Sequence, residues 1–290
     1  MIHMARGDRK DGIYLKKLNP FDSFIPFIMN ARNDSMNTFE DSVEVTEIDR
    51  YLRKKREEGL KGLGMLHLFL AAYIRVVSQR PAINRFIAGQ RIYAAKDIVF
   101  VLAVKKEMSS AGEETTIKVK FDPRDTLTDV YNKLNAEIEK VQKGEDTSTD
   151  NTAALLGKIP RLLLKVVLWI IKIIDYFGKL PQVLLNASPF HGSLIITDVA
   201  SLGIQPIYHH LYNFGTLPLF LAFGAKRKVY EVQKDGTVAA KKYIDYKVTT
   251  DERICDGFYY AQCFKYLKSY LRHPEILELP PETVEKDPAL

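Results

Sequence analysis

Thr249-Thr-Asp-Glu-Arg-Ile-Cys-Asp-Gly257 and the residues that follow it decide the fold of this chain. The first residues are typical of the end of a strand, Asp256-Gly257 of a tight turn, and residues 258–272 of an amphipathic helix. Asp256 is suited to cap this helix, because its carboxylate can accept hydrogen bonds from amides of the first turn. The stretch therefore predicts a strand, a turn and a helix in this order.

The composition is that of a globular protein. The chain has 290 residues, of which 46% are apolar and 27% charged, which suits one large domain or two ordinary ones. Its net charge of +6 favours contact with anions. Dispersed lysines are the simpler explanation, and since no nucleic-acid-binding motif accompanies the charge, we expect no nucleic-acid partner.

Cysteine content and the N-terminus indicate the compartment. Cys255 and Cys263 are the only cysteines, so we expect neither a disulfide framework nor a thiolate metal site. Residues 1–10 carry charges with no apolar run behind them, so we expect no secretory signal. These features predict a cytoplasmic protein.

Hydrophobic periodicity predicts strands and helices without strict alternation. Lys234-Asp-Gly-Thr237 separates two alternating segments and predicts a hairpin, because Asp-Gly tolerates the positive φ of a tight turn. Residues 144–152 are small, polar and acidic, and we expect a surface loop there. The pattern predicts an α+β fold with a large mixed β-sheet flanked by helices. The expected strands are 43–48, 98–104, 116–121, 193–196, 217–223, 228–232 and 238–248, and the expected helices are 49–59, 63–79, 126–142 and 258–272.

Four segments of the chain follow one another in an order that is typical of one family. They are residues 36–50, Pro81-Ala-Ile-Asn84, residues 193–203 and the Asp256-Gly257 turn. Together they resemble the chloramphenicol acetyltransferase superfamily, and within it the catalytic domain of the acyltransferase component of 2-oxo-acid dehydrogenase complexes, whose signature is His-x-x-x-Asp-Gly. The resemblance implies a chloramphenicol acetyltransferase-like fold and a homotrimer.

The resemblance also suggests a division of the chain. It covers residues 20–275, which we interpret as one acyltransferase-like domain. Residues 153–187 are interpreted as an inserted, hydrophobic amphipathic segment, and residues 1–19 and 276–290 as terminal extensions. The acyltransferases of the complexes carry lipoyl and subunit-binding modules ahead of this domain, for which the chain has no room. We therefore expect a stand-alone protein.

The chemistry that the resemblance implies depends on Glu252, which stands where the family has its histidine. In the family that histidine is the general base that takes a proton from the thiol of coenzyme A or dihydrolipoamide, and a Ser or Thr hydroxyl stabilises the oxyanion. Thr197 matches this hydroxyl, and Asp256 matches the aspartate that organises the turn. Coenzyme A or lipoyl thioesters are therefore the expected co-substrates, with no bound cofactor.

Glutamate is a weaker base than histidine. An unperturbed glutamate has a pKa about 4 units below that of a thiol, against about 2 units for histidine. The difference costs roughly 3 kcal/mol and slows the proton transfer by about two orders of magnitude. Burial raises the pKa of a carboxyl group and recovers part of this loss.

Simpler interpretations of the same residues stay open. Thr197 suits an ordinary strand position, Asp256 a helix cap without a catalytic role, and Glu252 a surface charge or an ion-pair partner of Arg253 or a lysine. The alternative to an acyltransferase is therefore a catalytically inactive family member that serves as an oligomeric scaffold or a membrane-surface binding protein.

His209 and His210 are a second pair of candidate site residues. They lie in the Tyr-rich segment 206–213, which follows the strand of Thr197, and could supply a base or contact the substrate. No Asp, Glu or Cys lies at ligand spacing, so we expect no metal site.

Residues 155–179 are the most apolar stretch of the chain. Arg161, Lys165, Lys172 and Asp175 would share one narrow stripe of a helix, with apolar side chains around the rest. The internal lysines disfavour a transmembrane helix. Three interpretations remain: packing against the domain or a sister subunit, peripheral contact with a membrane interface, or a lid over a long acyl chain.

Overall fold

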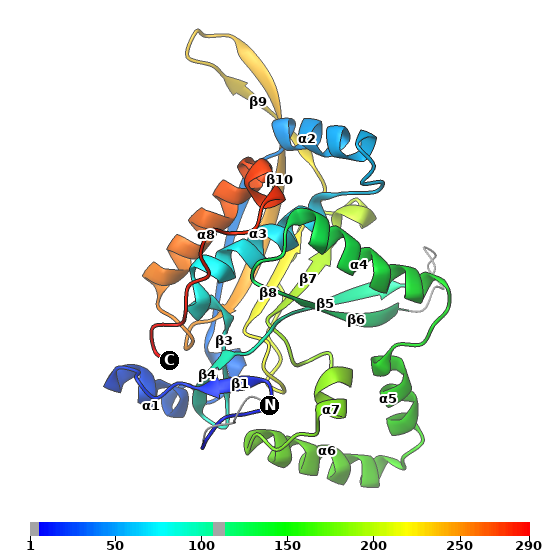
Figure 1. Ribbon diagram of the computed structural model, residues 1–290, viewed down its shortest axis with the longest axis vertical. Coiled ribbons are helices and arrows are strands. Elements are labelled where there is room, and N and C mark those ends of the chain that lie inside the picture. Colours follow the sequence, from blue (N-terminus) through cyan, green and yellow to red (C-terminus); the bar gives the residue numbers. More distant parts are fainter. Residues whose placement is uncertain (1–5, 107–113) are drawn as a thin grey trace.

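The computed structural model describes residues 6–106 and 114–290, and its centre is a seven-stranded mixed β-sheet (Figure 1). Within this sheet β7 is parallel to both of its neighbours, and the other pairs are antiparallel. The strands lie in the order β2 (Met36–Glu44), β10 (Val238–Asp251), β8 (Leu219–Phe223), β7 (Leu194–Asp198), β5 (Ile98–Lys105) and β6 (Glu114–Phe121), and β9 (Arg227–Val232) pairs with the first half of β10.

Helices cover one face of this sheet (Figure 1). They are α2 (Thr46–Glu57), α3 (Met65–Gln79), α4 (Leu127–Gln142) and α8 (Gly257–Arg272). α3 is buried along nearly its whole length, as expected from its apolar side chains on all sides. Leu219, Leu221 and Phe223 of β8 face these helices, because alternate residues of a strand point to opposite faces. The hydrophobic core lies between this layer and the sheet.

The opposite face of the sheet is partly covered by the loop that follows β7. Phe220 and Ala222 of β8 point to this side and pack with Leu211 of the loop. The loop also contains a short 3-10 helix, η3 (Ala200–Leu202). Three other 3-10 helices, η1 (Arg32–Asp34), η2 (Pro81–Asn84) and η4 (Pro274–Glu278), connect the larger elements.

Residues near each end of the described chain pack against its middle part. β1 (Gly12–Tyr14) pairs with β4 (Arg91–Ala95), which also pairs with β3 (Arg85–Ala88) in a separate three-stranded sheet. Near the C-terminus, the buried Asp287 accepts hydrogen bonds of 2.6 Å from Nε and Nη2 of Arg85. The division into a domain and two terminal extensions stays a prediction, and residues 1–5 lie outside the described residues.

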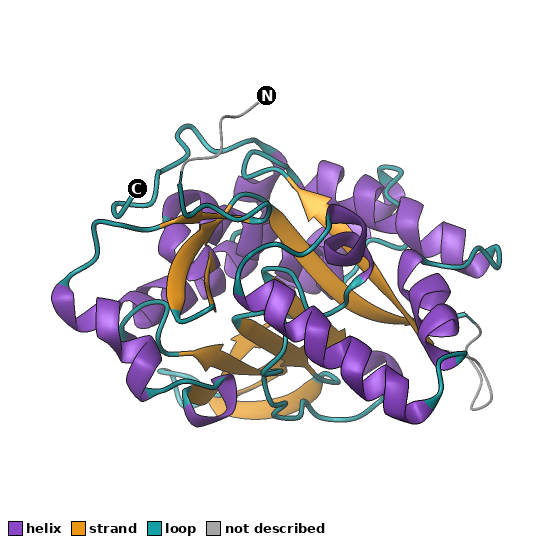
Figure 2. Ribbon diagram, turned by 90° about the horizontal axis from the view of Figure 1, so that it is seen from below, coloured by secondary structure: helices purple, strands orange, loops and turns teal. Residues whose placement is uncertain are grey.

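Three helices lie below the sheet in Figure 1: α5 (Ser148–Gly157), α6 (Arg161–Tyr176) and α7 (Gln182–Ala187). α1 (Pro20–Ile28) lies at the same end of the molecule, which Figure 2 views from below. α6 confirms that a helix forms in the apolar stretch 155–179. None of the helices in the described ranges is long and apolar enough to cross a membrane.

Most of the expected elements are confirmed, and two expectations are wrong. The hairpin at 234–237 joins β9 to β10. The loop expected at 144–152 is wrong, because α5 begins at Ser148, and Thr147 and Asp150 cap it by exchanging hydrogen bonds. The strand expected at 43–48 ends at Glu44 instead. α2 begins at Thr46, where helical spacing buries Ile48 and Leu52 on one side.

Candidate active site

The turn between β10 and α8 has the predicted form. β10 ends at Asp251 and α8 begins at Gly257. Asp256 is the N-cap of α8, and its Oδ1 accepts a hydrogen bond of 2.7 Å from the amide of Tyr259. Because the cap satisfies an amide that has no partner within the helix, Asp256 fixes where the turn ends.

Glu252 is the first residue of this turn and is exposed. Its amide donates a hydrogen bond of 3.0 Å to the Ser35 carbonyl, which anchors the backbone of the turn. Within the described ranges its carboxylate has no hydrogen bond or ion pair. The alternative of an ion pair with Arg253 is not observed, because Arg253 is paired with Asp251. Among the described residues, Glu252 is therefore an unpaired surface carboxylate on a fixed backbone.

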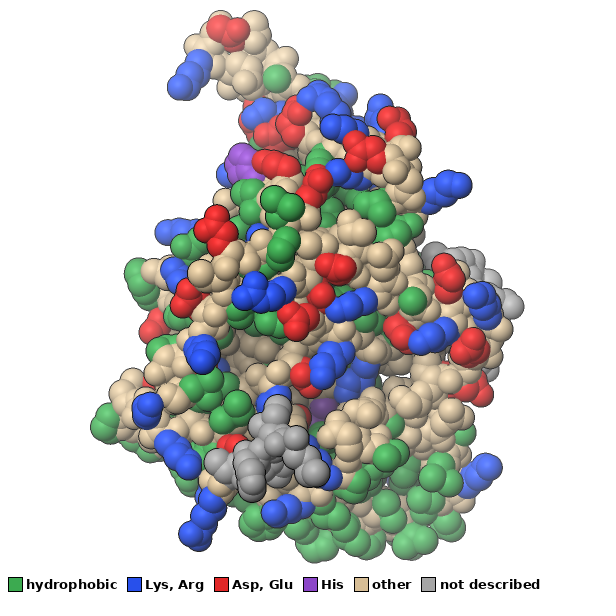
Figure 3. All heavy atoms as spheres, in the orientation of Figure 1, with side chains coloured by type: hydrophobic (Ala, Val, Ile, Leu, Met, Phe, Trp, Pro, Cys, Tyr) green, Lys and Arg blue, Asp and Glu red, His purple; other side chains and the backbone are tan. Residues whose placement is uncertain are grey.

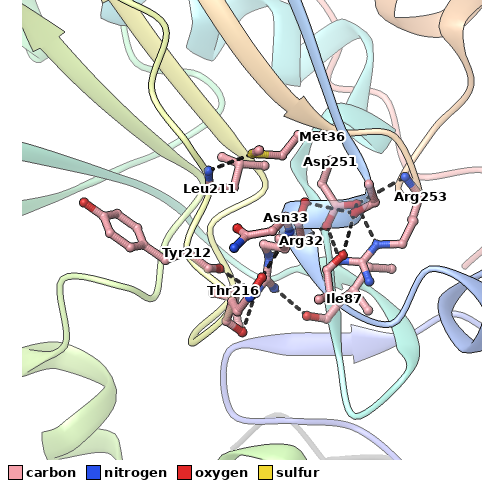
Figure 4. Close-up of polar contacts among 12 residues, drawn as sticks. Arg32, Asn33, Met36, Ile87, Leu211, Tyr212, Thr216, Asp251 and Arg253 are labelled. Atoms are coloured by element: carbon pink, nitrogen blue, oxygen red, sulfur yellow. Dashed lines mark hydrogen bonds and ion pairs between the residues drawn. The ribbon is translucent and has the colours of Figure 1, made fainter.

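A buried cluster of charges lies at the start of the turn, where Arg32 and Arg253 point toward Asp251 (Figure 4). Arg253 donates hydrogen bonds of 2.7 Å from Nε and Nη2 to the two carboxylate oxygens of Asp251. Nε of Arg32 lies 3.7 Å from Oδ2 of the same carboxylate, and the Ser35 hydroxyl lies 3.2 Å from Oδ1. One buried carboxylate thus offsets two buried guanidinium groups.

Arg32 connects this cluster to two other parts of the fold. It donates hydrogen bonds to the carbonyls of Ile87, at 2.6 Å, and Tyr212, at 3.2 Å (Figure 4). Burial lowers the pKa of Arg32 to about 10, although the nearby Asp251 carboxylate opposes this change. The end of β10, the β3 strand and the loop after β7 therefore meet at a single arginine.

A cavity of about 360 Å³ lies beside this cluster. Its lining includes three cations, Arg32, Arg253 and Lys172, together with the carboxylate of Asp175 and the amide of Asn213. Arg32 and Arg253 already have a carboxylate partner, which leaves Lys172 as the exposed cation of the wall. The excess of positive charge suits an anionic group.

A larger cavity, of about 750 Å³, lies between the sheet and the helices below it. Lys118 of β6 forms part of its wall and donates hydrogen bonds to the carbonyls of Leu185, at 2.6 Å, and Ser188, at 3.0 Å. Burial lowers the pKa of the Lys118 amine to about 8. This cavity has both signs of charge, since Asp97 and Glu137 also line it.

Thr197 does not meet Glu252 within one copy of the chain. It lies on β7 opposite Ala222 of β8, and Ala222 lies opposite Lys247 of β10. Lys247 precedes Glu252 by five residues, which corresponds to about 16 Å along a strand. The two residues could therefore act together only if they come from different copies of the chain.

His209 and His210 lie in the loop that covers the outer face of the sheet. The His209 ring stacks on Phe220 with 4.2 Å between centroids, and the His210 ring stacks on His209 at 4.6 Å. Neither ring lines the two cavities described above. Their assignment as substrate contacts stays a prediction, and so do the roles of Glu252, Asp256 and Thr197.

The part of the chain that the structure describes contains no group of three or more His, Cys, Asp or Glu side chains placed to hold a metal ion. Cys255, beside the turn, is half-buried, and burial raises the pKa of its thiol well above the usual value. A thiol in that state is a poor nucleophile, which disfavours Cys255 as a reactive group.

Comparison with known proteins identifies the fold. No family model and no curated protein matches the sequence. The structure is similar to a probable dihydrolipoamide acetyltransferase from Listeria monocytogenes, with a TM-score of 0.57, 15% identity, and coverage of 93% of this chain and 96% of that one. It is also similar to the dihydrolipoamide acetyltransferase of Azotobacter vinelandii, with a TM-score of 0.59, 14% identity and coverage of 89% of both chains.

A chloramphenicol acetyltransferase is similar as well, with a TM-score of 0.53 and 11% identity over 89% of this chain and 99% of that one. The class is thus defined by fold: this chain has the α+β fold shared by chloramphenicol acetyltransferase and the catalytic core of dihydrolipoamide acetyltransferase. The fold expected from the sequence is confirmed. At these identities the likeness concerns the fold alone.

Proposed function

We propose that this chain transfers an acyl group from a coenzyme A or lipoyl thioester to an acceptor, and that it does so as a homotrimer. The observation that carries the proposal is the position of Glu252. It is an exposed carboxylate on a turn fixed by Asp251 and Asp256, at the place where the resembling family has its general base. The acyltransferases that share the fold suggest the same reaction class by analogy, and the site itself must carry the argument.

In the proposed reaction, Glu252 takes the proton from the acceptor thiol. The thiolate attacks the carbonyl carbon of the thioester, and the Thr197 hydroxyl donates a hydrogen bond to the oxyanion that forms. Collapse of the tetrahedral intermediate breaks the original carbon–sulfur bond. The departing thiolate then takes the proton back from Glu252, so the carboxylate is regenerated and no other reactant is consumed.

The proposed site lies between subunits. Glu252 and Thr197 are separated by about 16 Å of strand within one chain. Glu252 of one copy would therefore meet Thr197 of a neighbouring copy. Glu252 is exposed in the single subunit, and a neighbour would also bury it and make it a stronger base. We assign the phosphate groups of coenzyme A to the 360 Å³ cavity, because Lys172 and the two arginines give its wall an excess of positive charge.

The test is transfer from a panel of short-chain to long-chain acyl-coenzyme A thioesters, with thiol and amine acceptors present. We expect turnover that falls strongly in Glu252→Ala and in Thr197→Val. Glu57→Gln is a matched control, since Glu57 is an exposed carboxylate on α2. Turnover that is unchanged in Glu252→Ala would remove Glu252 as the base. His210→Ala, in the same panel, tests the proposed substrate contact through a change in KM.

The second candidate is a catalytically inactive scaffold or membrane-surface binding protein. It is favoured by the lack of any partner for the Glu252 carboxylate within the described ranges, since a general base usually has an orienting contact. Acyl-transfer turnover separates the two candidates, and calorimetric titration with coenzyme A shows whether an inactive chain still binds the co-substrate. Binding without turnover, or neither, would support the second candidate, whereas turnover that depends on both Glu252 and Thr197 excludes it.

A further inference from the structure

α6 turns an apolar face away from the molecule. Asp175 is its only buried residue, and Leu162 is 82% and Trp169 62% exposed. Exposed apolar side chains are normal when scattered singly, but a continuous group marks a contact site. The exposed large apolar residues of this segment are Leu155, Leu162, Leu163, Val166, Leu168, Trp169, Ile170, Ile173, Tyr176 and Phe177.

α1 adds a second apolar group at the same end of the molecule (Figures 1 and 2). Phe21, Phe24, Phe27 and Ile28 are exposed, with Phe27 at 59% and Ile28 at 69%. Figure 3 shows hydrophobic side chains gathered over the lower end of the molecule, where α6 lies. We call the exposed apolar residues of α1 and of the segment 155–177 the apolar end.

The charges of residues 153–187 are almost all positive, whereas α1 contains one acidic residue, Asp22, and no basic one. Residues 153–187 contain one carboxylate, that of Asp175, which is buried and accepts a hydrogen bond of 2.7 Å from Arg9. All basic residues of this segment are exposed: Lys158, Arg161, Lys165, Lys172 and Lys179. At about 100° per residue, Arg161, Lys165 and Lys172 form one stripe beside the exposed face of Leu162 and Trp169.

α6 is held in this orientation by the body of the protein. Besides the pair between Asp175 and Arg9, Nε2 of His191 lies 3.2 Å from the Asp175 carboxylate. The Tyr176 hydroxyl donates a hydrogen bond of 2.8 Å to Oε1 of Gln90, in the turn between β3 and β4. One side of the helix is therefore fixed to the domain, and the apolar face must point outward.

We propose that the apolar end docks onto the interface of a membrane that contains anionic lipids. α6 has 16 residues and spans about 24 Å, less than the hydrocarbon core of about 30 Å, so it would lie in the plane of the interface. Its apolar side chains would enter the acyl region, Trp169 would lie at the headgroup level, and Arg161 and Lys165 of the basic stripe would face the lipid phosphates. The charge of the segment favours this occupant over a second copy of the same basic surface.

Trp169 makes the proposal testable, because it is the only tryptophan of the chain. The emission of the 290-residue protein is followed while vesicles of phosphatidylcholine alone, or of phosphatidylcholine with phosphatidylserine, are added. We expect a blue shift and co-sedimentation with the anionic vesicles, and both effects should weaken at high ionic strength. Lack of any shift, with no co-sedimentation, would overturn the proposal.

Variants locate the contact. Leu162→Glu with Val166→Glu should abolish binding, because it places two charges in the acyl region. Arg161→Gln with Lys165→Gln should weaken binding to anionic vesicles about 30-fold, if each basic residue contributes as expected near such a surface. The matched control is Tyr230→Glu with Val232→Glu, on the β9–β10 hairpin at the far end of the molecule (Figure 1). Equal losses in the control would contradict docking through the apolar end.

The fluorescence of Trp169 also detects a protein that covers the apolar end. In the lipid-free protein, iodide should quench the fluorescence of Trp169 as it does that of an exposed tryptophan, and to the same degree at every protein concentration. If Trp169 is already blue-shifted and protected from iodide without lipid, and dilution reverses this, then another copy of the chain covers the apolar end. That result would also overturn the proposal.

Discussion

Arg253 donates hydrogen bonds to both carboxylate oxygens of Asp251, two residues before it, and both side chains are buried. The ion pair fixes the backbone of the three residues 251–253. Glu252 is the middle residue, and its side chain is exposed. A bidentate pair fixes orientation as well as distance. The turn therefore presents the candidate base from a rigid support, whatever reaction it serves.

Asp251→Asn should destabilise the protein strongly. The substitution leaves Arg253 and Arg32 buried without a negative partner, and breaking a buried pair in this way costs about 3–5 kcal/mol. The free energy of unfolding in urea measures the loss. Glu252→Gln is the matched control and should change stability by no more than about 0.5 kcal/mol, because its carboxylate is exposed. Similar losses in the two variants would contradict the role given to Asp251.

Asp256→Ala should cost about 1 kcal/mol, as the loss of a helix N-cap typically does. Asp256→Asn and Asp256→Ser keep an acceptor for the Tyr259 amide and should retain most of the stability. Urea unfolding of the three variants gives the comparison. If Asp256→Asn is as unstable as Asp256→Ala, the negative charge rather than the cap is what the turn requires.

The sequence was most informative where local chemistry decides the structure. The Asp235-Gly236 turn and the alternating segments around it predicted the hairpin, because both signals depend only on neighbouring residues. The same local chemistry was misread at Thr147 and Asp150. Their spacing is that of a capping box, which begins a helix, whereas polar composition alone suggested a loop.

The buried charge cluster could not have been predicted from the sequence. Arg32 and Asp251 lie near opposite ends of the chain, and only the pairing of β2 with β10 brings them together. In the sequence each is an ordinary charged residue of the kind that usually lies on the surface. Glu252 and Thr197 were found only through resemblance to a family, because a lone glutamate and a strand threonine have no signal of their own.

Lys118 should make stability depend on pH in a definite direction. Its pKa in the folded protein is about 8, below the value of about 10.4 for an unfolded lysine. Burial of the protonated amine therefore lowers the stability of the folded state. The loss is complete below pH 8 and disappears as the pH rises toward about 10.4. Compared with Lys118→Met, the wild type should gain stability over this window, by at most about 3 kcal/mol.

The measurement for Lys118 is urea unfolding of both proteins at pH 7 and pH 9.5. Other groups titrate in both proteins, so their contributions cancel in the difference. Lys120→Met is a suitable control, since Lys120 lies on the same strand but is exposed. If the free energy of unfolding of the wild type and of Lys118→Met changes equally between pH 7 and pH 9.5, the pKa of the Lys118 amine is not lowered in the folded protein.

Glu252→His tests the proposed chemistry by gain of activity. If the chain removes a proton from a thiol at this position, an imidazole should do so more easily than a carboxylate, because its pKa lies about 2 units closer to that of the thiol. The gain amounts to roughly 3 kcal/mol, or about two orders of magnitude in the rate of acyl transfer. Glu252→Gln, which keeps the shape without a base, should be inactive in the same assay. An increase in Glu252→His together with loss in Glu252→Gln would make position 252 the base. Equal rates in all three proteins would mean that the fold is retained here without that chemistry.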